Sequence, residues 1–431
     1  MTTGGNSRFN LRSRLAGEML HTWVSLLAIP NVRWLVVARL LANVYFYSAV
    51  IVRFEFDRGL NFTQIFLLES VLSLAVLLLN IPTGVWADRW GYRTLLIVSH
   101  MLGALSVVVM LFAHGFLLFA IADVLFGAGI ACASGCEDAL LLHSIADSPD
   151  AASHGRAGSA FALRGAATSA GFFIGLVSGS LFAAHDPTIA VVATLAPAWL
   201  AVAVAFRLRS DATGASLDEH TSGEFGPRST VYALLRGAAR LIAQRPLLIA
   251  LSLLESVAFA CVNAIFWYNQ PLLGRAGVAT QWFGPLTALA VAFAILTAFL
   301  LPVVRRWVGR RWLFAVSLLA PGVAYLLLAQ KHGAVLVVAL IALVVGGSAW
   351  RTPLLSEAVN ERIGDVGRAT TLSALSFIGS FVGIGVNVLV GRAGDAGIAV
   401  VGAALGLALV ILAGVALWLM PGGDMEPAKL S

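Results

Sequence analysis

Long apolar runs recur along the whole chain and limit what it can fold into. Two of the clearest, Ile65 to Val85 and Thr94 to Phe112, are each about 20 residues long. A helix rising 1.5 Å per residue would cross a hydrocarbon core of roughly 30 Å over that length. Only 12% of the residues are charged, against roughly 25% in an ordinary soluble domain. The sequence therefore predicts an all-α integral membrane protein.

Counting apolar windows predicts twelve transmembrane helices. The expected spans are 32–54, 63–85, 94–113, 117–141, 158–183, 188–207, 246–267, 281–303, 313–330, 334–357, 369–391 and 397–420. They divide the chain into an N-terminal cytoplasmic or interfacial segment, a six-helix half, a cytoplasmic linker with an amphipathic helix, a second six-helix half and a cytoplasmic tail. These regions are 1–31, 32–207, 208–245, 246–420 and 421–431.

The two predicted halves repeat each other at an offset of roughly 212 to 218 residues. Gly155-Arg156-Ala157 recurs as Gly367-Arg368-Ala369. Leu40-Leu41, followed by a valine and a phenylalanine, corresponds to Leu253-Leu254 with the same followers. A duplicated six-helix unit explains this pattern, because each helix of the first unit then has an equivalent in the second.

The distribution of Lys and Arg predicts the orientation of the helices in the membrane. With the N-terminus inside, 20 of the 28 basic residues fall on the cytoplasmic side, 5 fall outside and 3 fall within spans. An excess of Lys and Arg in cytoplasmic loops is the usual rule for helical membrane proteins. Both termini are therefore expected in the cytoplasm, and the net charge of +6 reflects topology rather than nucleic-acid binding.

A charged stretch connects the second and third predicted spans. Its sequence, Gly84-Val85-Trp86-Ala87-Asp88-Arg89-Trp90-Gly91-Tyr92-Arg93, has the pattern G-x-x-x-D-R-x-G-x-R and is expected to form a turn. The pattern resembles the loop motif of the major facilitator superfamily of secondary transporters, with matches at Gly84, Asp88, Arg89, Gly91 and Arg93. The resemblance implies two pseudo-symmetric six-helix halves that rock around a central site.

The same resemblance gives the motif a role in conformational switching. In the family, the motif aspartate faces the start of the eleventh helix and helps to hold the outward-open state. In this chain it would set Asp88 against the segment around Gly367 and Arg368. An anion is favoured there because the N-terminus of a helix carries partial positive charge.

Ionisable residues inside the predicted spans are the candidates for transport chemistry. A charge at the centre of a lipid-facing helix costs at least about 2.5 to 3.5 kcal/mol, so each such residue should face a partner or a wet cavity. Glu255 lies about nine residues into its span, roughly 14 Å deep, and is the first candidate for proton coupling or for binding a cationic group. The alternative is a fixed ion pair with Arg39 or Arg164.

Two further acids, three arginines and two amides complete the candidate list. Asp123 begins the sequence Asp123-Val124-Leu125-Phe126-Gly127-Ala128-Gly129, which is similar to the fourth-helix motif R-x-x-x-G-x-G of proton-coupled family members, but with aspartate in place of arginine. Glu69 is either a proton or substrate site or a partner of Arg53 or Arg58. The remaining candidates are Arg39, Arg164, Arg351, Asn43 and Asn263.

A second group of charges is predicted to be structural. Glu137 and Asp138 fall at the cytoplasmic end of the fourth span and are expected to pair with Arg89, Arg93 or Arg156. Glu357 and Arg368 are assigned to the same network. Arg351 and Glu357 are six residues apart, off one helical face, so inter-helix partners are expected for both.

The sequence excludes several classes of function. It contains no nucleotide-binding loop, zinc-ligand cluster or nucleophile elbow, so we expect no cofactor, no metal and no enzymatic activity. The expected partners are a small-molecule substrate, protons or another coupling ion and the lipid bilayer, with no nucleic acid, and the chain is expected to be a monomer.

These observations favour a transporter of a small organic solute in a bacterial cytoplasmic membrane, working by proton-coupled export. Three alternatives remain open: an uptake symporter for a sugar, peptide or metabolite, a lipid flippase on the same fold, and a transport-dead sensor or scaffold protein.

Overall fold

The computed structural model describes residues 22–146, 156–209, 246–362 and 368–419, and in these ranges the regular structure is entirely helical. The first group of helices is α2 (Pro30–Ala42), η1 (Phe46–Ala49), α3 (Ile51–Asp57), α4 (Phe62–Trp90), α5 (Tyr92–Phe112), α6 (Gly115–Ala133), α7 (Cys136–Ala146), α8 (Arg156–Phe182) and α9 (Pro187–Ala205). Eleven helical segments of the described ranges are long and apolar enough to cross a membrane, with a possible twelfth in the bent pair Thr22–Ala28 and Pro30–Ala49.

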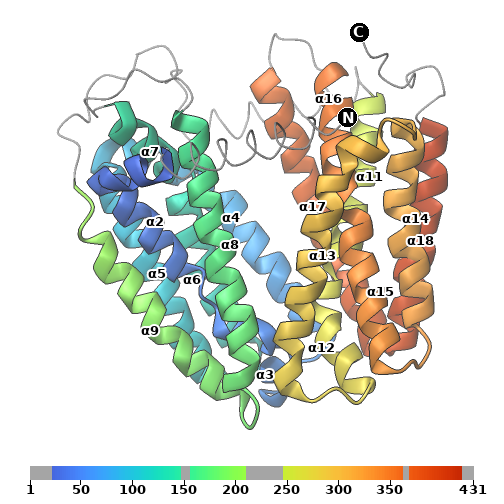
Figure 1. The fold of residues 1–431 in the computed structure, drawn as a ribbon. Helices are drawn as coiled ribbons and strands as arrows, with labels where there is room; N and C mark the ends of the chain where they lie inside the picture. The colour runs from blue at the N-terminus through green and yellow to red at the C-terminus, as the bar shows by residue number, and fades with distance from the viewer. Residues whose placement is uncertain (1–21, 147–155, 210–245, 363–367, 420–431) are drawn as a thin grey trace, which may run out of the picture.

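The second group repeats this arrangement. It comprises α11 (Pro246–Asn263), α12 (Ile265–Arg275), η2 (Thr280–Trp282), α13 (Phe283–Val304), α14 (Arg310–Leu328), α15 (Ala334–Gly347), η3 (Ser348–Trp350), α16 (Arg351–Arg362), α17 (Arg368–Asp395) and α18 (Ile398–Leu419). Figure 1 shows the two groups as separate bundles. We call the first the N-terminal half and the second the C-terminal half.

Four of the spans predicted as continuous helices are broken. The first becomes α2, η1 and α3, the fourth becomes α6 and α7, the seventh becomes α11 and α12, and the tenth becomes α15, η3 and α16. Apolar composition predicts that a segment crosses the membrane but does not show where it bends. The break in the fourth span coincides with Gly135, whose φ is 78°, a conformation that glycine adopts without strain.

Close packing of α8 explains the break in the first span. A Cβ on Gly175 would lie 2.6 Å from the backbone nitrogen of Tyr45, and one on Gly179 would lie 1.8 Å from the carbonyl oxygen of Phe46. The missing side chains let the irregular backbone between α2 and α3 rest directly on α8, as small residues do at helix contacts in membranes. The backbone N–H of Phe46, in this irregular segment, donates a hydrogen bond to Thr194 Oγ1 at 3.1 Å, so this polar group has a partner outside a regular helix.

The predicted turn in the charged motif is shorter than expected. Helix α4 begins with a capping box, in which Asn61 and Gln64 exchange side-chain to backbone hydrogen bonds, and continues without interruption to Trp90. The motif from Gly84 to Trp90 is therefore helical, and only Gly91, with φ of 81°, forms the turn before α5. A tight reversal between two helices needs this left-handed residue, and the preceding charged residues tolerate helical geometry.

The halves meet at one end of the bundle and separate at the other. They touch through α4 with α17, α8 with α13 and α3 with α12. Figure 1 shows α3 and α12 side by side at the bottom, whereas α7 and α16 lie apart at the top. We call the end with α3 and α12 the closed end, and the end with Gly91, α7 and α16 the motif end.

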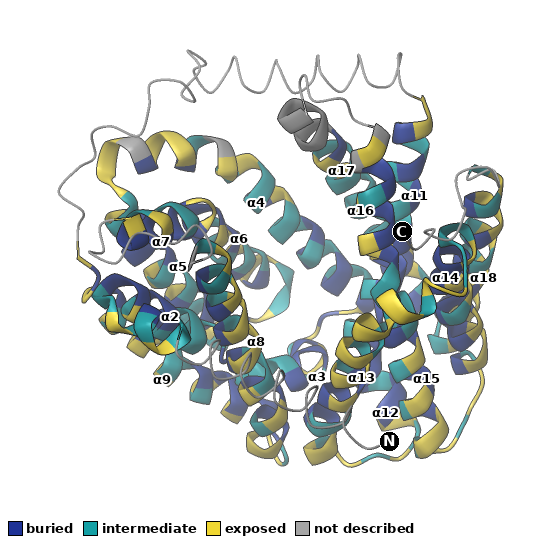
Figure 2. Ribbon diagram, turned by 45° about the horizontal axis from the view of Figure 1, so that its top comes forward, coloured by how far each residue is buried: buried dark blue, intermediate teal, exposed yellow. Residues whose placement is uncertain are grey.

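Apolar side chains cover both the interior and the lipid-facing exterior. Exposed residues include Phe299 on α13 and Trp418 on α18, with 76% and 79% of their surface accessible, and Figure 2 shows exposed positions along the outward sides of α9 and α13. Exposed apolar side chains are typical of helices that face lipid, because lipid, unlike water, does not favour a polar surface.

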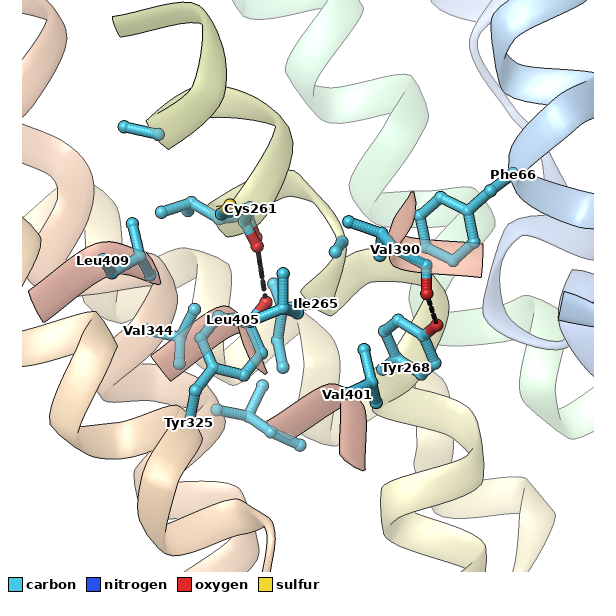
Figure 3. Close-up of a cluster of buried hydrophobic side chains, with 14 of the residues drawn as sticks. Phe66, Cys261, Ile265, Tyr268, Tyr325, Val344, Val390, Val401, Leu405 and Leu409 are labelled. Carbon is cyan, nitrogen blue, oxygen red and sulfur yellow. Dashed lines mark hydrogen bonds between the residues drawn. The ribbon is translucent and has the colours of Figure 1, made fainter. Parts of the chain in front are cut away.

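Buried tyrosines tie together the C-terminal half. Figure 3 shows Tyr325 donating to the carbonyl oxygen of Cys261, at 2.9 Å, and Tyr268 donating to the carbonyl oxygen of Val390, also at 2.9 Å. Both hydroxyls thereby find a partner in an apolar core. Phe66 of the N-terminal half stacks on Tyr268 with ring centroids 5.4 Å apart, so the same core extends into the contact between the halves.

Several sequence predictions fall outside the described residues. They are the N-terminal segment before residue 22, most of the linker with its amphipathic helix and the C-terminal tail. The side chains of Asp88, Arg156 and Arg368 are also outside the description, as is Gly367.

Candidate transport site

A cavity of about 610 Å³ lies between the two halves. Its walls come from α11, α16 and α17 of the C-terminal half and from α4 of the N-terminal half, which contributes Glu69 and Ser73. This volume lies within the range of small-molecule sites, which is roughly 300 to 1,000 Å³. The cavity carries both polar and charged groups on its wall.

Hydroxyl groups dominate the polar lining of the cavity. Six of them occur as three pairs at a spacing of four residues, on α11, α16 and α17 respectively: Ser252 and Ser256, Thr352 and Ser356, and Ser376 and Ser380. Residues four apart lie on one face of a helix, so each helix turns a hydroxyl face toward the cavity. Asn263, Asn387 and Phe259 complete the groups that could contact an organic solute.

Glu255 lines the cavity and forms an ion pair with Arg351. The Oε2 atom of Glu255 is 2.5 Å from Nη1 of Arg351, and Thr352 donates its hydroxyl to Oε1 at 3.3 Å. The Arg351 side chain is only 4% exposed, whereas that of Glu255 is 20% exposed. The pair therefore presents its carboxylate to the cavity and keeps its guanidinium behind the wall.

This ion pair corrects the expected partner of Glu255. Arg39 and Arg164 were expected as possible partners, but both lie in the N-terminal half and bind other acids. Nη1 of Arg39 is 3.1 Å from Glu137 Oε1. Arg164 pairs with Asp138 and lies 3.7 Å from Glu137 Oε2. Charges of opposite sign were available in both halves, and only the packing of helices selects among them.

The same contacts correct the expected pairing of Glu137 and Asp138 with arginines of the motif. These acids were expected to bind Arg89, Arg93 or Arg156, and the side chain of Arg156 lies outside the described residues. Instead, Arg93 donates to the backbone oxygens of Leu208 and Phe206, at 2.6 and 3.2 Å, and Arg89 is exposed. The break at Gly135 turns Glu137 into the bundle, where its side chain is 8% exposed, so it meets arginines of α2 and α8 rather than those of the motif.

The remaining charged candidates occupy three different environments. Glu69 lies on the cavity wall, and its alternative partners are engaged elsewhere: Arg53 donates to Thr280 at 2.7 Å, and Arg58 donates to the carbonyl oxygen of Ala113 at 3.2 Å. Asp123 lies in α6, behind the cavity wall. Glu357 pairs with Arg305, the residue after α13, at 2.8 Å.

The two candidate amide residues lie in different parts of the structure. Asn263 lines the cavity. Asn43 instead donates to the backbone oxygen of Arg39 at 2.7 Å and borders a smaller pocket of about 70 Å³ inside the N-terminal half. The structure thus brings Glu255, Glu69 and Asn263 to one site and places Arg39, Arg164 and Asn43 in another.

Sequence reasoning missed the hydroxyl residues of the cavity. Serine and threonine are ordinary in transmembrane helices, and none of them was singled out. Their spacing of four residues on α11, α16 and α17 is the signal that could have found them, because it marks a polar stripe on helices that are otherwise apolar.

Polar contacts close the site at the closed end. The carboxylate of Asp395 accepts hydrogen bonds from the backbone N–H groups of Phe62 and Thr63, at 2.8 and 3.2 Å. Gln270 accepts from the backbone N–H of Val52 at 3.1 Å. These contacts join the halves on one side of the cavity. Across the described ranges, no cluster of three or more His, Cys, Asp or Glu residues could hold a metal ion.

Comparison with known proteins identifies the class of this fold. The family model of the Major Facilitator Superfamily matches residues 34–386, and the chain belongs to this family of transporters. No curated protein matches the sequence.

Solved structures share the fold at low identity. A variant of nucleoside transporter NupG superposes with a TM-score of 0.76 at 13% identity, covering 90% of this chain and 100% of that chain. The POT family transporter PepTSo gives 0.66 at 12% identity, covering 90% and 97%. Peptide transporter POT in complex with sulfate gives 0.64 at 16% identity, covering 91% and 96%.

Proposed function

We propose that the chain is a proton-coupled secondary transporter that moves a small polar organic solute through the cavity by alternating access. The observation that carries this proposal is the Glu255 to Arg351 ion pair on the wall of a hydroxyl-lined cavity between two half-bundles. A carboxylate at such a site can bind a proton, bind a cationic group of the solute or remain paired with its arginine. Each choice changes the charge of the cavity.

In the proposed cycle, a proton, the solute and Arg351 compete for the carboxylate of Glu255. When its carboxylate takes a proton, the attraction to Arg351 weakens, and the guanidinium becomes free to contact a solute group or the opposite half. Moving one charge through 100 mV is worth roughly 2.3 kcal/mol, about a fifty-fold concentration ratio. One proton per solute therefore supplies a useful driving force.

The motif end is proposed as the cytoplasmic face. The excess of Lys and Arg on that side supports this orientation, and the halves are joined at the opposite, closed end. In that orientation the structure represents an inward-open state. Asp88 is proposed to act in the switch to the outward-open state. The arginine-rich, lysine-poor composition supports a bacterial cytoplasmic membrane.

The chemistry of the cavity distinguishes between candidate substrates. Seven hydroxyls, two amides and two carboxylates on the wall favour a polar solute over a lipid chain, because unpaired polar groups are costly against hydrocarbon. The structural neighbours bear the names of nucleoside and peptide transporters, which supports transport of a polar metabolite. Export in exchange for protons, which the sequence favoured, and uptake by symport both use inward proton flow and differ in the direction in which the solute moves.

Proton flux in membrane vesicles tests the proposal. Everted vesicles with an acid interior would be challenged with cationic dyes, antibiotics, nucleosides and small peptides, and right-side-out vesicles in an outward-acid gradient would be tested for uptake of the same compounds. We expect one class of compound to collapse the gradient or to accumulate, and we expect the effect to be lost in Glu255→Gln. Collapse of the gradient in everted vesicles indicates export, whereas accumulation in right-side-out vesicles indicates symport.

A matched control variant distinguishes loss of the cavity carboxylate from loss of an ordinary exposed ion pair. Glu357→Gln removes the pair with Arg305, whose partners are 36% and 42% exposed, and should leave transport within about twofold of the wild type because exposed pairs contribute little. Equal transport by wild type and Glu255→Gln would contradict the role of Glu255 in coupling.

A further inference from the structure

Three acidic residues gather in the N-terminal half behind the cavity. They are Glu55 on α3, Asp123 on α6 and Glu69 on α4. Glu55 is 5% exposed, and its Oε2 atom is buried without a hydrogen-bond partner in the described part of the chain. A carboxylate that is more than nine-tenths buried and unpaired is rare, because its desolvation is uncompensated.

Helix packing brings these acids to one level of the bundle. The rings of Phe54 and Phe119 meet edge to face at 5.9 Å, so Glu55 follows a residue that contacts α6 one turn before Asp123. A Cβ on Gly127, one turn beyond Asp123, would lie 3.0 Å from Cβ of Ala75 and 3.2 Å from the oxygen of Leu72. Since Leu72 lies three residues beyond Glu69 on a parallel helix, Asp123 and Glu69 face the same layer.

The three carboxylates act on one another electrostatically. Both Asp123 and Glu69 act on Glu55, and Glu69 acts on Asp123. The phenol of Tyr47, from η1, is also within the electrostatic reach of Asp123 and Glu55. All of these groups are acids, so each one that ionises makes ionisation of the others harder.

The basic groups of the neighbouring elements are directed elsewhere. On α3 itself, Arg53 binds Thr280, and Arg58 binds Ala113 and His114 at the end of α5. From α12 the nearby polar group is the neutral Gln270, and from α17 it is another acid, Asp395. Arg39 of α2 is paired with Glu137. No ion pair to Glu55, Glu69 or Asp123 exists among the residues that the structure places.

We propose that Glu55, Asp123 and Glu69 form a proton-binding cluster that is separate from the Glu255 to Arg351 pair and exchanges protons with the cavity through Glu69. Three uncompensated carboxylates in a low-dielectric bundle would cost far more than one, and bound protons remove that cost without a second ion. Within the described residues these acids do not form a group that could hold a metal ion, which favours the proton as the bound species.

The inference rests on the proposed transport function, and it assigns two tasks to two sites. Glu255, paired with Arg351, would contact the solute, while the acidic cluster would store the coupling protons. Glu69 connects the two, because it is the one member of the cluster that also lines the cavity. Arg53, two residues before Glu55, donates its backbone N–H to Gln270 of the other half at 3.4 Å. This hydrogen bond joins the halves at the closed end and must break when that end opens during transport. Protonation of the cluster would therefore change the charge next to this hydrogen bond.

Infrared difference spectroscopy tests the cluster without knowledge of the substrate. The full-length protein in lipid nanodiscs would be titrated from neutral to alkaline pH, and the C=O stretch of protonated carboxyl groups would be followed. We expect a band at neutral pH that disappears on alkaline titration and is weaker in Glu55→Gln, Asp123→Asn and Glu69→Gln. Glu357→Gln, at an exposed ion pair, should leave the band unchanged. Thermal unfolding of each variant shows which of them are folded, and any one folded variant is sufficient for the comparison.

Two outcomes would overturn the proposal. A band that is absent from the wild type, or that has equal intensity in all folded variants, would show that the cluster holds no protons. A carboxylate signal that responds to NaCl at constant pH, rather than to pH, would assign the site to a metal cation instead. The infrared band is measured without substrate, so its absence would contradict the proton-binding cluster but not the proposed transport function, which the vesicle assay tests. A vesicle assay that shows no transport would contradict the proposed function, and the infrared band would still test the cluster.

Discussion

The two halves of this protein carry the same ion pair with the charges reversed. In the N-terminal half Arg39 of α2 binds Glu137 of α7, and in the C-terminal half Glu255 of α11 binds Arg351 of α16. Glu137 and Arg351 occupy equivalent repeat positions, whereas Arg39 and Glu255 lie on equivalent helices but three residues out of register, because Leu40-Leu41 corresponds to Leu253-Leu254. The duplication has preserved a salt bridge between equivalent helices, although the two charges have changed places. The shared constraint is therefore charge compensation inside the membrane rather than the identity of either residue.

The difference between the halves lies in a second pair. The N-terminal half adds Asp138 and Arg164, which bind each other. The equivalent positions in the C-terminal half are Thr352 and Ser376, and both line the cavity. Long charged side chains fill the N-terminal half, where the pocket beside Arg39 has about 70 Å³. Short hydroxyl residues leave about 610 Å³ next to the C-terminal pair. Arg39 therefore borders a small pocket, whereas Glu255 borders the large cavity.

Removing the acid of each pair should separate stability from transport, and this is the largest effect that we expect. Glu137→Gln takes the buried carboxylate from Arg39 and leaves Arg164 with Asp138 alone, so it should lower the free energy of unfolding by about 3 kcal/mol but leave coupling intact. Glu255→Gln leaves the buried Arg351 without its carboxylate and should cost a similar amount of stability, and in addition it should abolish coupled transport. Denaturant unfolding in nanodiscs and vesicle transport measure the two effects.

A charge swap sharpens this comparison. Glu255→Arg combined with Arg351→Glu restores opposite charges but moves the carboxylate from α11 to α16, away from the hydroxyl of Thr352. We expect the double variant to recover stability relative to Arg351→Ala but not to recover transport. Wild-type transport by the swapped protein would show that this pair is only structural.

Transplanting the second pair should remove the difference between the halves. Thr352→Asp with Ser376→Arg gives the C-terminal half the residues that the N-terminal half has at these positions. The added side chains should fill the cavity and bind each other, so transport should fall by at least about tenfold, equivalent to 1.4 kcal/mol, while the protein stays folded. Thr352→Ser with Ser376→Ala is the size-conserving control. Retained transport by the transplanted variant would place the solute path elsewhere.

Two glycines at equivalent repeat positions test how each half is packed. A Cβ on Gly179 would meet the backbone of its own half, at Phe46, whereas one on Gly391 would lie 2.7 Å from Cα of Thr63 in the other half. Alanine at either site should cost about 1 to 3 kcal/mol, because the backbone cannot yield.

Hydrogen exchange distinguishes the two glycine variants. The backbone amides of Phe62 and Thr63 are protected by Asp395 across the closed end. Gly391→Ala should speed their exchange, and Gly179→Ala should not. Gly383→Ala, where nothing lies within 4 Å, is the control for alanine in the same helix. Equal protection in the Gly391 and Gly383 variants would contradict a tight contact at this end.

The smallest expected effect concerns the start of the last helix in each half. Asp186 caps α9 by accepting from the backbone N–H of Thr188 at 2.7 Å, whereas α18 follows Gly397, which has φ of 128°. Asp186→Ala should cost about 0.5 to 1 kcal/mol, the lower part of the range for caps, because the site is exposed.

The pH dependence of this cap has a defined sign. The hydrogen bond from the Thr188 backbone lowers the pKa of Asp186 below its ordinary value of 3.8. The cap therefore stabilises the fold at pH values above about 4, and its contribution is lost as the pH falls through the lowered pKa. The difference in stability between the wild type and Asp186→Ala should disappear in strong acid. A constant difference down to that range would exclude an ionised cap.

The sequence was most informative where a local property decided the outcome. Apolar runs of about 20 residues predicted which segments span the membrane, because the bilayer imposes one length on all of them. The motif from Gly84 to Arg93 indicated the family, which the comparison confirmed. The breaks in four spans were not predicted, because apolar residues tolerate a bend wherever a neighbouring helix can satisfy the exposed backbone.

The partners of the charged residues depended on the tertiary structure. Glu255 could have met Arg39 or Arg164 on grounds of charge alone, yet it meets Arg351, and Glu137 meets arginines of α2 and α8 instead of those in the motif. Glu55 follows directly after the predicted span 32–54 and was not among the candidates, yet it is buried in the structure. Its burial depends on how α3 packs against helices from other parts of the chain.

By itself, the sequence determined that this chain is a duplicated bundle of membrane-spanning helices whose interior charges must be compensated, since the bilayer penalises any unpaired charge wherever the helices pack. Only the tertiary structure decided which charges compensate each other and where the interior stays open. The pairing of charges and the position of the open space depend on how each helix is rotated and on the volume of side chains from different segments, such as Arg164 in one half and Ser376 in the other. No local sequence pattern encodes helix rotation or the fit of side chains between segments.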